Sequence, residues 1–178
     1  MQASPNILRL SLAPLILVTF FVQAQTPTTG TIRFTGSIID VPCEIDTAAT
    51  SSNVPMGKVF ANDFGGVGSV AGAKDFKIAL KGCGSSTNGA TVRFTGVSDA
   101  SKPEALQVTA DSSEPAGGIA LQLVDDIGTP IDIGSDSKVH TITEGINVFN
   151  FQARYISTAP IVTGGGANAQ ALFTLTYK

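Results

Sequence analysis

The segment "ANAQALFTLTYK" (residues 167–178) places an apolar side chain at every second position. A period of two is typical of a β-strand that presents one face to a core. The chain ends one residue after Tyr177, and we find no spare strand to cover this edge. Because long hydrophobic edges are usually protected, the segment predicts a β-domain that lacks a strand. The apolar row consists of Ala169, Ala171, Phe173, Leu175 and Tyr177.

The opposite end of the chain carries a strand pattern that is one more than such a domain needs. In "TPTTGTIRFTGSIID" (residues 26–40), Gly30, Ile32 and Phe34 alternate with Thr31 and Arg33. Proline and a threonine cluster precede this strand, which is typical of a tail outside a folded domain. The sequence thus predicts one strand too few at the C-terminus and one too many near the N-terminus.

The remainder of the chain predicts a single all-β domain. Turn residues separate the strand-like segments, and no window keeps a helical period for three turns. Short strands at this spacing indicate an antiparallel sandwich or barrel, with an immunoglobulin-like sandwich favoured. The expected strands are residues 35–45, 75–82, 90–96, 105–109, 118–125, 130–133, 146–157 and 168–178.

The first 24 residues predict a secretory signal peptide. Arg9 is the only charge before the apolar run of residues 10–22, and Val22 and Ala24 are the small side chains that a signal peptidase requires. The run is shorter than the ~20 residues of a membrane span, so we expect cleavage after Ala24 and no membrane insertion. The 11 Lys and Arg and 14 Asp and Glu residues are scattered, which argues against nucleic acid as a partner.

Cys43 and Cys83 are the only cysteines. In an exported protein an isolated pair most simply forms one disulfide, here closing a loop that would stabilise the fold by roughly 4 kcal/mol. A metal site would require further Cys or His nearby, and His140 is the only other candidate. The disulfide is therefore the preferred interpretation.

Enzymatic interpretations find little support. The Gly-rich "GGVGSVAGAK" (residues 65–74) lacks the strand and helix of a dinucleotide site, so we predict a flexible loop. The acidic "DDIGTPIDIGSD" (residues 125–136) lacks the calcium-loop spacing and is interpreted as a turn and a strand edge. His140 is predicted to occupy a surface strand position. We expect no catalytic residues, no metal site and no cofactor.

Several motifs together resemble the subunits of chaperone–usher fimbriae, most closely the major pilin of type 1 fimbriae. They are "GTIRFTGSI" before the first cysteine, "ALKGC" at the second, "FQARYIST" at residues 151–158, and Gly165 followed by the penultimate Tyr177. The resemblance implies an incomplete immunoglobulin-like antiparallel β-sandwich that lacks its last strand. It divides the chain into a signal peptide (residues 1–24), a donor-strand extension (25–34) and a pilin domain (35–178).

The resemblance also implies a function. The missing strand would be supplied first by a periplasmic pilus chaperone and then, after passage through an outer-membrane usher, by the extension of a neighbouring pilin subunit. Gly30, Ile32 and Phe34 would form the donor strand of a homopolymeric surface fimbria used in adhesion. The acceptor groove and chaperone-docking edge would comprise Gly165, Ala171, Phe173, Leu175, Tyr177 and Lys178. The alternative is a secreted monomeric carbohydrate-binding β-sandwich module.

Overall fold

A computed structural model of the protein describes residues 32–36 and 43–178. The chain divides into two units, Met1–Gly36 and Ser37–Lys178, and the second contains all the strands considered below. The predicted signal peptide and Gly30 lie outside the described residues. Within the described part of the chain, no helix has the length and apolar character needed to cross a membrane.

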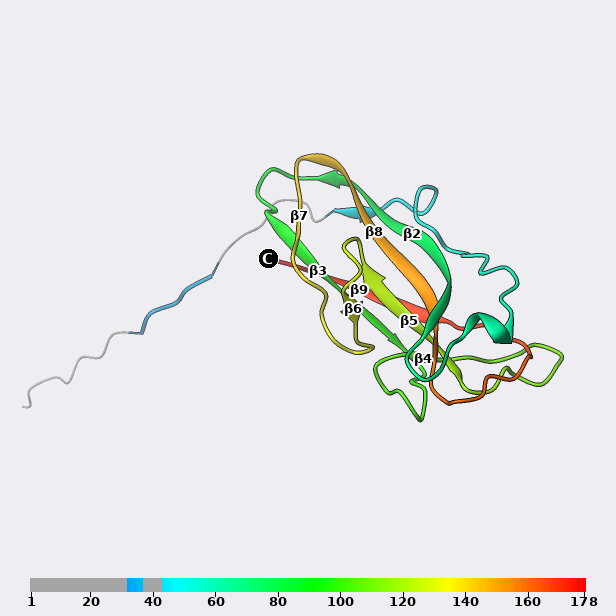
Figure 1. The fold of residues 1–178 in the computed structure, drawn as a ribbon. Coiled ribbons are helices and arrows are strands. Elements are labelled where there is room, and N and C mark those ends of the chain that lie inside the picture. Colours follow the sequence, from blue (N-terminus) through cyan, green and yellow to red (C-terminus); the bar gives the residue numbers. More distant parts are fainter. Residues whose placement is uncertain (1–31, 37–42) are drawn as a thin grey trace, which may run out of the picture. The chain divides into compact units, whose positions relative to one another are not determined.

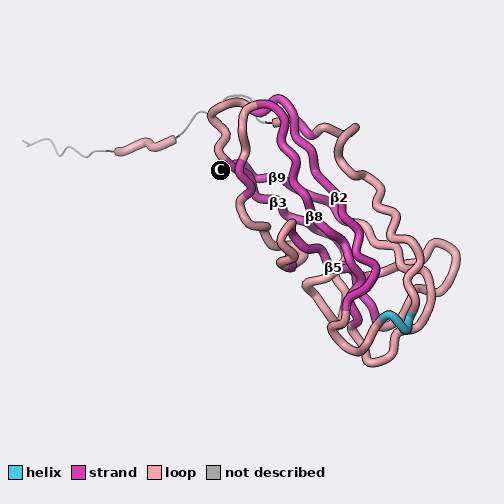
Figure 2. The backbone as a smooth tube through the Cα atoms, turned by 45° about the horizontal axis from the view of Figure 1, so that its top comes forward, coloured by secondary structure: helices cyan, strands magenta, loops and turns pink. Residues whose placement is uncertain are grey.

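The domain consists of two antiparallel sheets (Figures 1 and 2). The larger has the strand order β1-β2-β8-β5-β4, with β6 beside β5, and the smaller has the order β7-β3-β9. The only described helix is a short 3₁₀ turn, η1, at one end of the domain (Figure 2). The predicted all-β antiparallel fold is therefore confirmed. The bounds are β1 Glu44–Ile45, η1 Ala61–Asp63, β2 Val70–Cys83, β3 Gly89–Gly96, β4 Leu106–Gln107, β5 Ile119–Asp125, β6 Pro130–Ile131, β7 His140–Thr141, β8 Gly145–Ser157 and β9 Ala171–Tyr177.

The hydrophobic core lies between the two sheets. Alternation along β8 buries Phe149, Phe151 and Tyr155 on one face and leaves Ile146 and Val148 exposed on the other. Phe151 meets Phe94 of β3 edge to face, with ring centroids 5.2 Å apart. Edge-to-face pairs are a favoured aromatic geometry, so this contact joins the two sheets at the centre of the core.

The disulfide between Cys43 and Cys83 is present, as predicted. It connects the segment before β1 to the end of β2, across 40 residues of sequence. The hydroxyl of Tyr177 donates a hydrogen bond to the carbonyl oxygen of Cys43 at 2.9 Å. The end of β9 is thereby fastened to the segment that carries the disulfide.

The prediction that residues 65–74 form a loop is wrong in its second half. Strand β2 begins at Val70, and Val70 and Ala71 pair with Ile156 and Tyr155 of β8. The register shifts between Ala71 and Lys74, where Gly72 has a φ of +66°. A β-bulge inserts an extra residue and breaks the period of two, so simple alternation cannot detect this part of the strand.

The surface position predicted for His140 is also wrong. Its side chain is buried, and its ring stacks on Phe149 with centroids 4.5 Å apart. Its neighbours Val139 and Thr141 point outward and are exposed. Strand β7 has only two residues and pairs His140 with the small Ala90, which leaves room for the ring above the core. A two-residue strand shows no period from which its inward face could be read.

Candidate functional site: a groove beside the C-terminal strand

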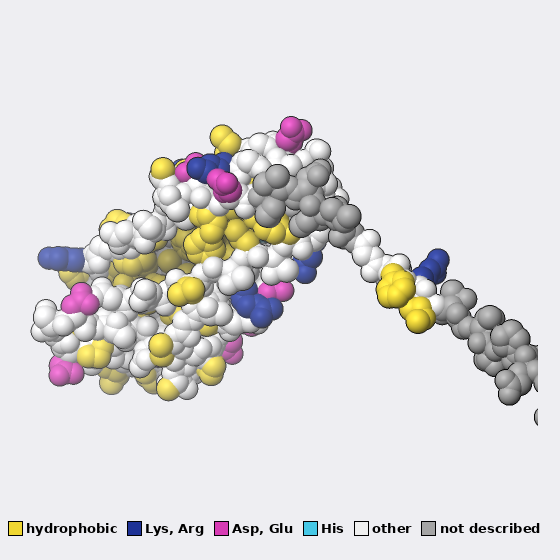
Figure 3. Space-filling view, turned by 180° about the vertical axis from the view of Figure 1, so that it is seen from behind, with side chains coloured by type: hydrophobic (Ala, Val, Ile, Leu, Met, Phe, Trp, Pro, Cys, Tyr) yellow, Lys and Arg dark blue, Asp and Glu magenta, His cyan; other side chains and the backbone are white. Residues whose placement is uncertain are grey.

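A groove of about 1030 Å³ with an apolar floor runs between the two sheets. One wall is the extended segment of residues 51–61, and the other is the chain from Thr163 into β9. The floor comes from both sheets, with side chains from β2, β3, β5 and β8. Figure 3 shows a hollow on this face in which hydrophobic side chains gather. The floor residues are Phe76, Ile78, Phe94, Ile119, Leu121, Leu123, Ala153 and Tyr155.

Strand β9 has a free edge along this groove. Among the strands of the described residues it pairs with β3 alone, from Ala171 opposite Gly96 to Tyr177 opposite Ala90. Phe94 and Val92 of β3 are buried, whereas their cross-strand partners Phe173 and Leu175 are only half-buried. The two rows face the same core, so the difference follows from the unpaired edge of β9.

Some of the residues predicted for the acceptor groove line it in the structure, and others lie beyond it. Gly165, Ala171 and Phe173 line it. Leu175 and Tyr177 continue the same inward row toward the C-terminus and pack against the core beyond the groove. Lys178 is exposed, and its backbone N–H donates to the carbonyl of Gly89 at 2.8 Å. Ala171, Phe173, Leu175 and Tyr177 thus share β9, whereas Gly165 precedes it, and the predicted residues do not all contribute to one cavity.

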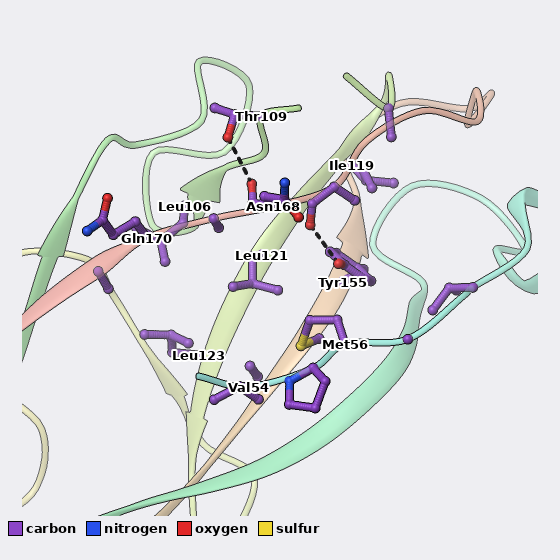
Figure 4. Close-up of a pocket in the computed structure, with 18 of the residues that line it drawn as sticks. Val54, Met56, Leu106, Thr109, Ile119, Leu121, Leu123, Tyr155, Asn168 and Gln170 are labelled. Carbon is purple, nitrogen blue, oxygen red and sulfur yellow. Dashed lines mark hydrogen bonds between the residues drawn. The ribbon is translucent and has the colours of Figure 1, made fainter. Parts of the chain in front are cut away.

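The wall of residues 51–61 was not identified from the sequence. Val54, Met56 and Val59 are half-buried, and Met56 and Val59 pack against the core, while Pro55 and Gly57 are exposed. Figure 4 shows Leu121 and Leu123 of β5 lying between the segment of Val54 and Met56 and the segment that carries Gln170, just before β9. The apolar residues at 54 and 56 keep a period of two, but Pro55 and Gly57 are turn residues and hide the pattern.

The chain that precedes β9 is held in place by hydrogen bonds to other segments of the domain. Thr109 and Asn168 exchange two backbone hydrogen bonds of 2.7 and 2.8 Å, and Tyr155 donates its hydroxyl to the carbonyl of Ala167 at 2.7 Å (Figure 4). Burial raises the pKa of Tyr155, which keeps this hydroxyl protonated as a donor. These hydrogen bonds position the groove wall that is formed by the chain preceding β9.

Gly165 lies where this wall crosses the segment of residues 114–116. A Cβ atom added to Gly165 would come within 2.5 Å of the Glu114 oxygen and the Ala116 nitrogen. The neighbouring Gly166 donates to the Glu114 carbonyl at 2.9 Å and accepts from the Ala116 N–H at 2.8 Å. Only glycine allows two backbones to approach this closely, so Gly165 sets the position of the wall.

The lining of the groove is nearly free of charge. Lys58 and Asp111 are its only ionisable side chains other than Tyr155. The ion pairs of the described residues lie elsewhere, for example between Lys138 and both Asp125 and Asp126. Burial would raise the pKa of Asp125, but the N–H groups of Thr129 and Ile127 and the charge of Lys138 lower it overall. The acidic stretch therefore includes a hydrogen-bonded turn.

Metal-ligating side chains do not gather among the described residues. These residues contain no group of three or more His, Cys, Asp or Glu side chains that could hold a metal ion. His140 is buried beside Phe149, outside the groove lining, and its Nε2 atom has no hydrogen-bond partner. What the groove can do is bind an extended, apolar segment of polypeptide along the free edge of β9.

The two described residues of the predicted donor strand, Ile32 and Phe34, lie in the first unit of the chain. Their side chains are 77% and 89% exposed. Residues 32–36 adopt no helix or strand. Large apolar side chains with this exposure are available for burial against another surface.

Comparison with known proteins gives a consistent result. The family described as "Fimbrial protein" matches residues 32–178. The probable major fimbrial subunit LpfA of Escherichia coli O157:H7 is 33% identical over 169 residues, which cover 94% of each chain. The type-1 fimbrial protein subunit of Serratia marcescens is 33% identical over 178 residues, covering 95% of this chain and 97% of the relative.

Solved structures agree with these relatives. A Burkholderia pseudomallei antigen and type I fimbria protein is 67% identical, with a TM-score of 0.61, and the match covers 84% of this chain and 99% of that one. The P pilus rod subunit PapA has the same fold, with a TM-score of 0.63 at 22% identity, over 78% of this chain and 100% of its own. The chain belongs to the fimbrial protein family, which is a family of structural pilus subunits and not of enzymes.

Proposed function

We propose that this fimbrial subunit polymerises by donor-strand exchange. The donor is the segment of residues 25–34 of a neighbouring copy, and the acceptor is the groove between residues 51–61 and β9. The observation that supports the proposal most directly is the free edge of β9 beside a groove with an apolar floor. Backbone groups of an inserted strand would pair with that edge, and its alternate side chains would enter the groove.

The predicted donor fits this groove in chemistry. Ile32 and Phe34 are two residues apart and would point to the same side of an extended strand. Burying each of them contributes about 1.5–3 kcal/mol, and each new backbone hydrogen bond adds about 1 kcal/mol. Gly30 would permit a close backbone approach at the next position on the same face. Arg33 would point away from the apolar floor.

The donor and acceptor are different surfaces of one chain, so the contact is heterologous and propagates a filament instead of closing a dimer. Before assembly, a periplasmic chaperone would cover the edge formed by Ala171, Phe173, Leu175 and Tyr177 and bind the terminal carboxylate of Lys178. After cleavage of residues 1–24, the subunit would pass through the periplasm to an outer-membrane usher. The product would be a homopolymeric fimbria on the cell surface that serves adhesion.

A pair of charge substitutions in the donor strand tests the proposal. Ile32→Asp would place a carboxylate in the apolar groove, whereas Arg33→Asp changes the adjacent side chain on the outward face. An unpaired charge in an apolar site costs several kcal/mol, so Ile32→Asp should prevent polymerisation and Arg33→Asp should not. Electrophoresis without boiling measures the detergent-resistant polymer. Equal polymer from both variants would contradict the register.

The acceptor side has its own matched pair. Phe173→Asp alters the groove, and Thr174→Asp alters the exposed face of the same strand. A mixture of Ile32→Asp and Phe173→Asp subunits should stop at dimers, because only the first has a working groove and only the second has a working donor. Far-UV circular dichroism checks that each variant is folded. A wild-type protein that remains monomeric would instead support a secreted carbohydrate-binding module.

A further inference from the structure

Met56 differs from the other residues that line the groove because its side chain carries a thioether sulfur, which can be oxidised. The sequence has two methionines, Met1 and Met56, and both cysteines are joined in the disulfide. Met56 is therefore the one thioether in the predicted mature chain. It lines the groove and is half-buried against the core. Figure 4 shows it between Val54 and Tyr155, within the cavity that the inserted strand would fill.

Met56 packs against the hydrophobic core at the floor of this groove. Leu121, Leu123 and Phe76 line the same cavity, and its charged side chains are limited to Lys58 and Asp111. Methionine fills such irregular apolar space because its side chain is flexible and polarisable. Its sulfoxide is polar, and the added oxygen would require a hydrogen-bond donor once water is excluded.

We propose that Met56 is an oxidation site whose reactivity depends on whether the groove is occupied. Hydrogen peroxide would reach Sδ in the open groove, and the inserted strand would shield it. In the reaction an S–O bond forms while the O–O bond of peroxide breaks. The sulfur loses two electrons, one peroxide oxygen is transferred to it, and the other leaves as water. The product, Met56 sulfoxide, would bind a donor strand less well.

This inference rests on the proposed donor-strand function, because the shielding and the loss of binding both require a strand in the groove. An unsatisfied polar atom in the apolar site should weaken strand acceptance by about ten- to one-hundred-fold. Sulfoxide reductases reverse the modification, so the effect would be recoverable. The groove would thus be vulnerable to oxidants for as long as no strand occupies it.

The first experiment treats purified monomeric subunit and preformed polymer with the same hydrogen peroxide concentration. Mass spectrometry of the proteolytic peptide that contains Met56 then measures the sulfoxide fraction over time. We expect oxidation in the monomer to be at least about ten-fold faster than in the polymer, because the strand excludes the reagent. Equal rates in the two samples would overturn the proposal that strand insertion shields Met56.

The second experiment follows polymer formation after peroxide treatment of the monomer, and Met56→Leu serves as the variant without a thioether. Each protein is compared with its own untreated sample, so any effect of the substitution itself cancels. The wild type should polymerise about ten-fold more slowly or worse after oxidation and recover with sulfoxide reductase. The Met56→Leu ratio should stay at one. A wild type that polymerises unchanged despite full oxidation would overturn the inference.

The two hypotheses fail in different ways. If untreated wild-type subunit forms no polymer, the donor-strand function is wrong, whatever happens to Met56. If untreated subunit polymerises but oxidation has no effect, the function stands and the role of Met56 is wrong.

Discussion

Substitution of Gly165 by alanine should destabilise the domain although it adds a single methyl group. The new Cβ would lie 2.5 Å from the Ala116 nitrogen and the Glu114 oxygen and 2.6 Å from the Pro115 carbonyl carbon. All three are backbone atoms, so a rotamer change cannot relieve the overlap. The two chain segments must separate, which also strains the 2.8 and 2.9 Å hydrogen bonds of Gly166.

The expected magnitude combines two effects. Overpacking costs about 1–3 kcal/mol, and weakening two backbone hydrogen bonds adds about 1 kcal/mol. Gly164→Ala is the matched control, because a Cβ at Gly164 meets nothing within 4 Å and neither glycine has a positive φ. That control should be neutral or stabilising by up to about 1 kcal/mol, since alanine restricts the unfolded chain.

Urea denaturation followed by far-UV circular dichroism provides the assay. With a slope of about 1–3 kcal/mol per molar urea, Gly165→Ala should lower the midpoint by about 1 M or more, while Gly164→Ala should leave it unchanged or raise it slightly. The two variants have the same composition, so any general effect of replacing glycine is removed by the comparison. Equal midpoints would refute the close approach at Gly165 as the feature that positions the groove wall.

Three further predictions concern the scaffold. Replacing Cys83 by serine frees Cys43 and should cost roughly 4 kcal/mol, seen as a lower urea midpoint; an unchanged midpoint would contradict this. Tyr177→Phe removes the 2.9 Å hydrogen bond to the Cys43 carbonyl and should cost about 1 kcal/mol in the same assay, and no loss would show that water replaces the bond. Burial lowers the pKa of His140, helped by Lys138, so the unfolded chain binds the proton first and stability should fall as the pH drops below about 6.5. His140→Gln should remove that part of the pH dependence, and an identical pH profile in the variant would assign it to other groups.

The sequence by itself was sufficient for the fold class and the disulfide. The segments 146–157 and 168–178 were predicted as strands and contain β8 and β9, because a sheet with one buried face imposes a period of two on its side chains. Two cysteines in a chain predicted to be exported left one simple pairing. The period of two is a property of neighbouring positions, and a chain with two cysteines offers a single pairing, so both could be predicted without knowledge of long-range contacts.

The tertiary structure decided where the groove lies and what forms it. The wall of residues 51–61 faces β9 because both sheets leave their core open between them, a relation between segments more than 100 residues apart that no local pattern encodes. His140 turns inward because the small Ala90 lies opposite it, and Gly165 is needed because a distant backbone crosses there. The face to which a residue of a two-residue strand points depends on the residues packed around it. The space for a side chain where two segments cross likewise depends on segments that are distant in the sequence. These positions therefore could not be assigned from the order of the amino acids alone.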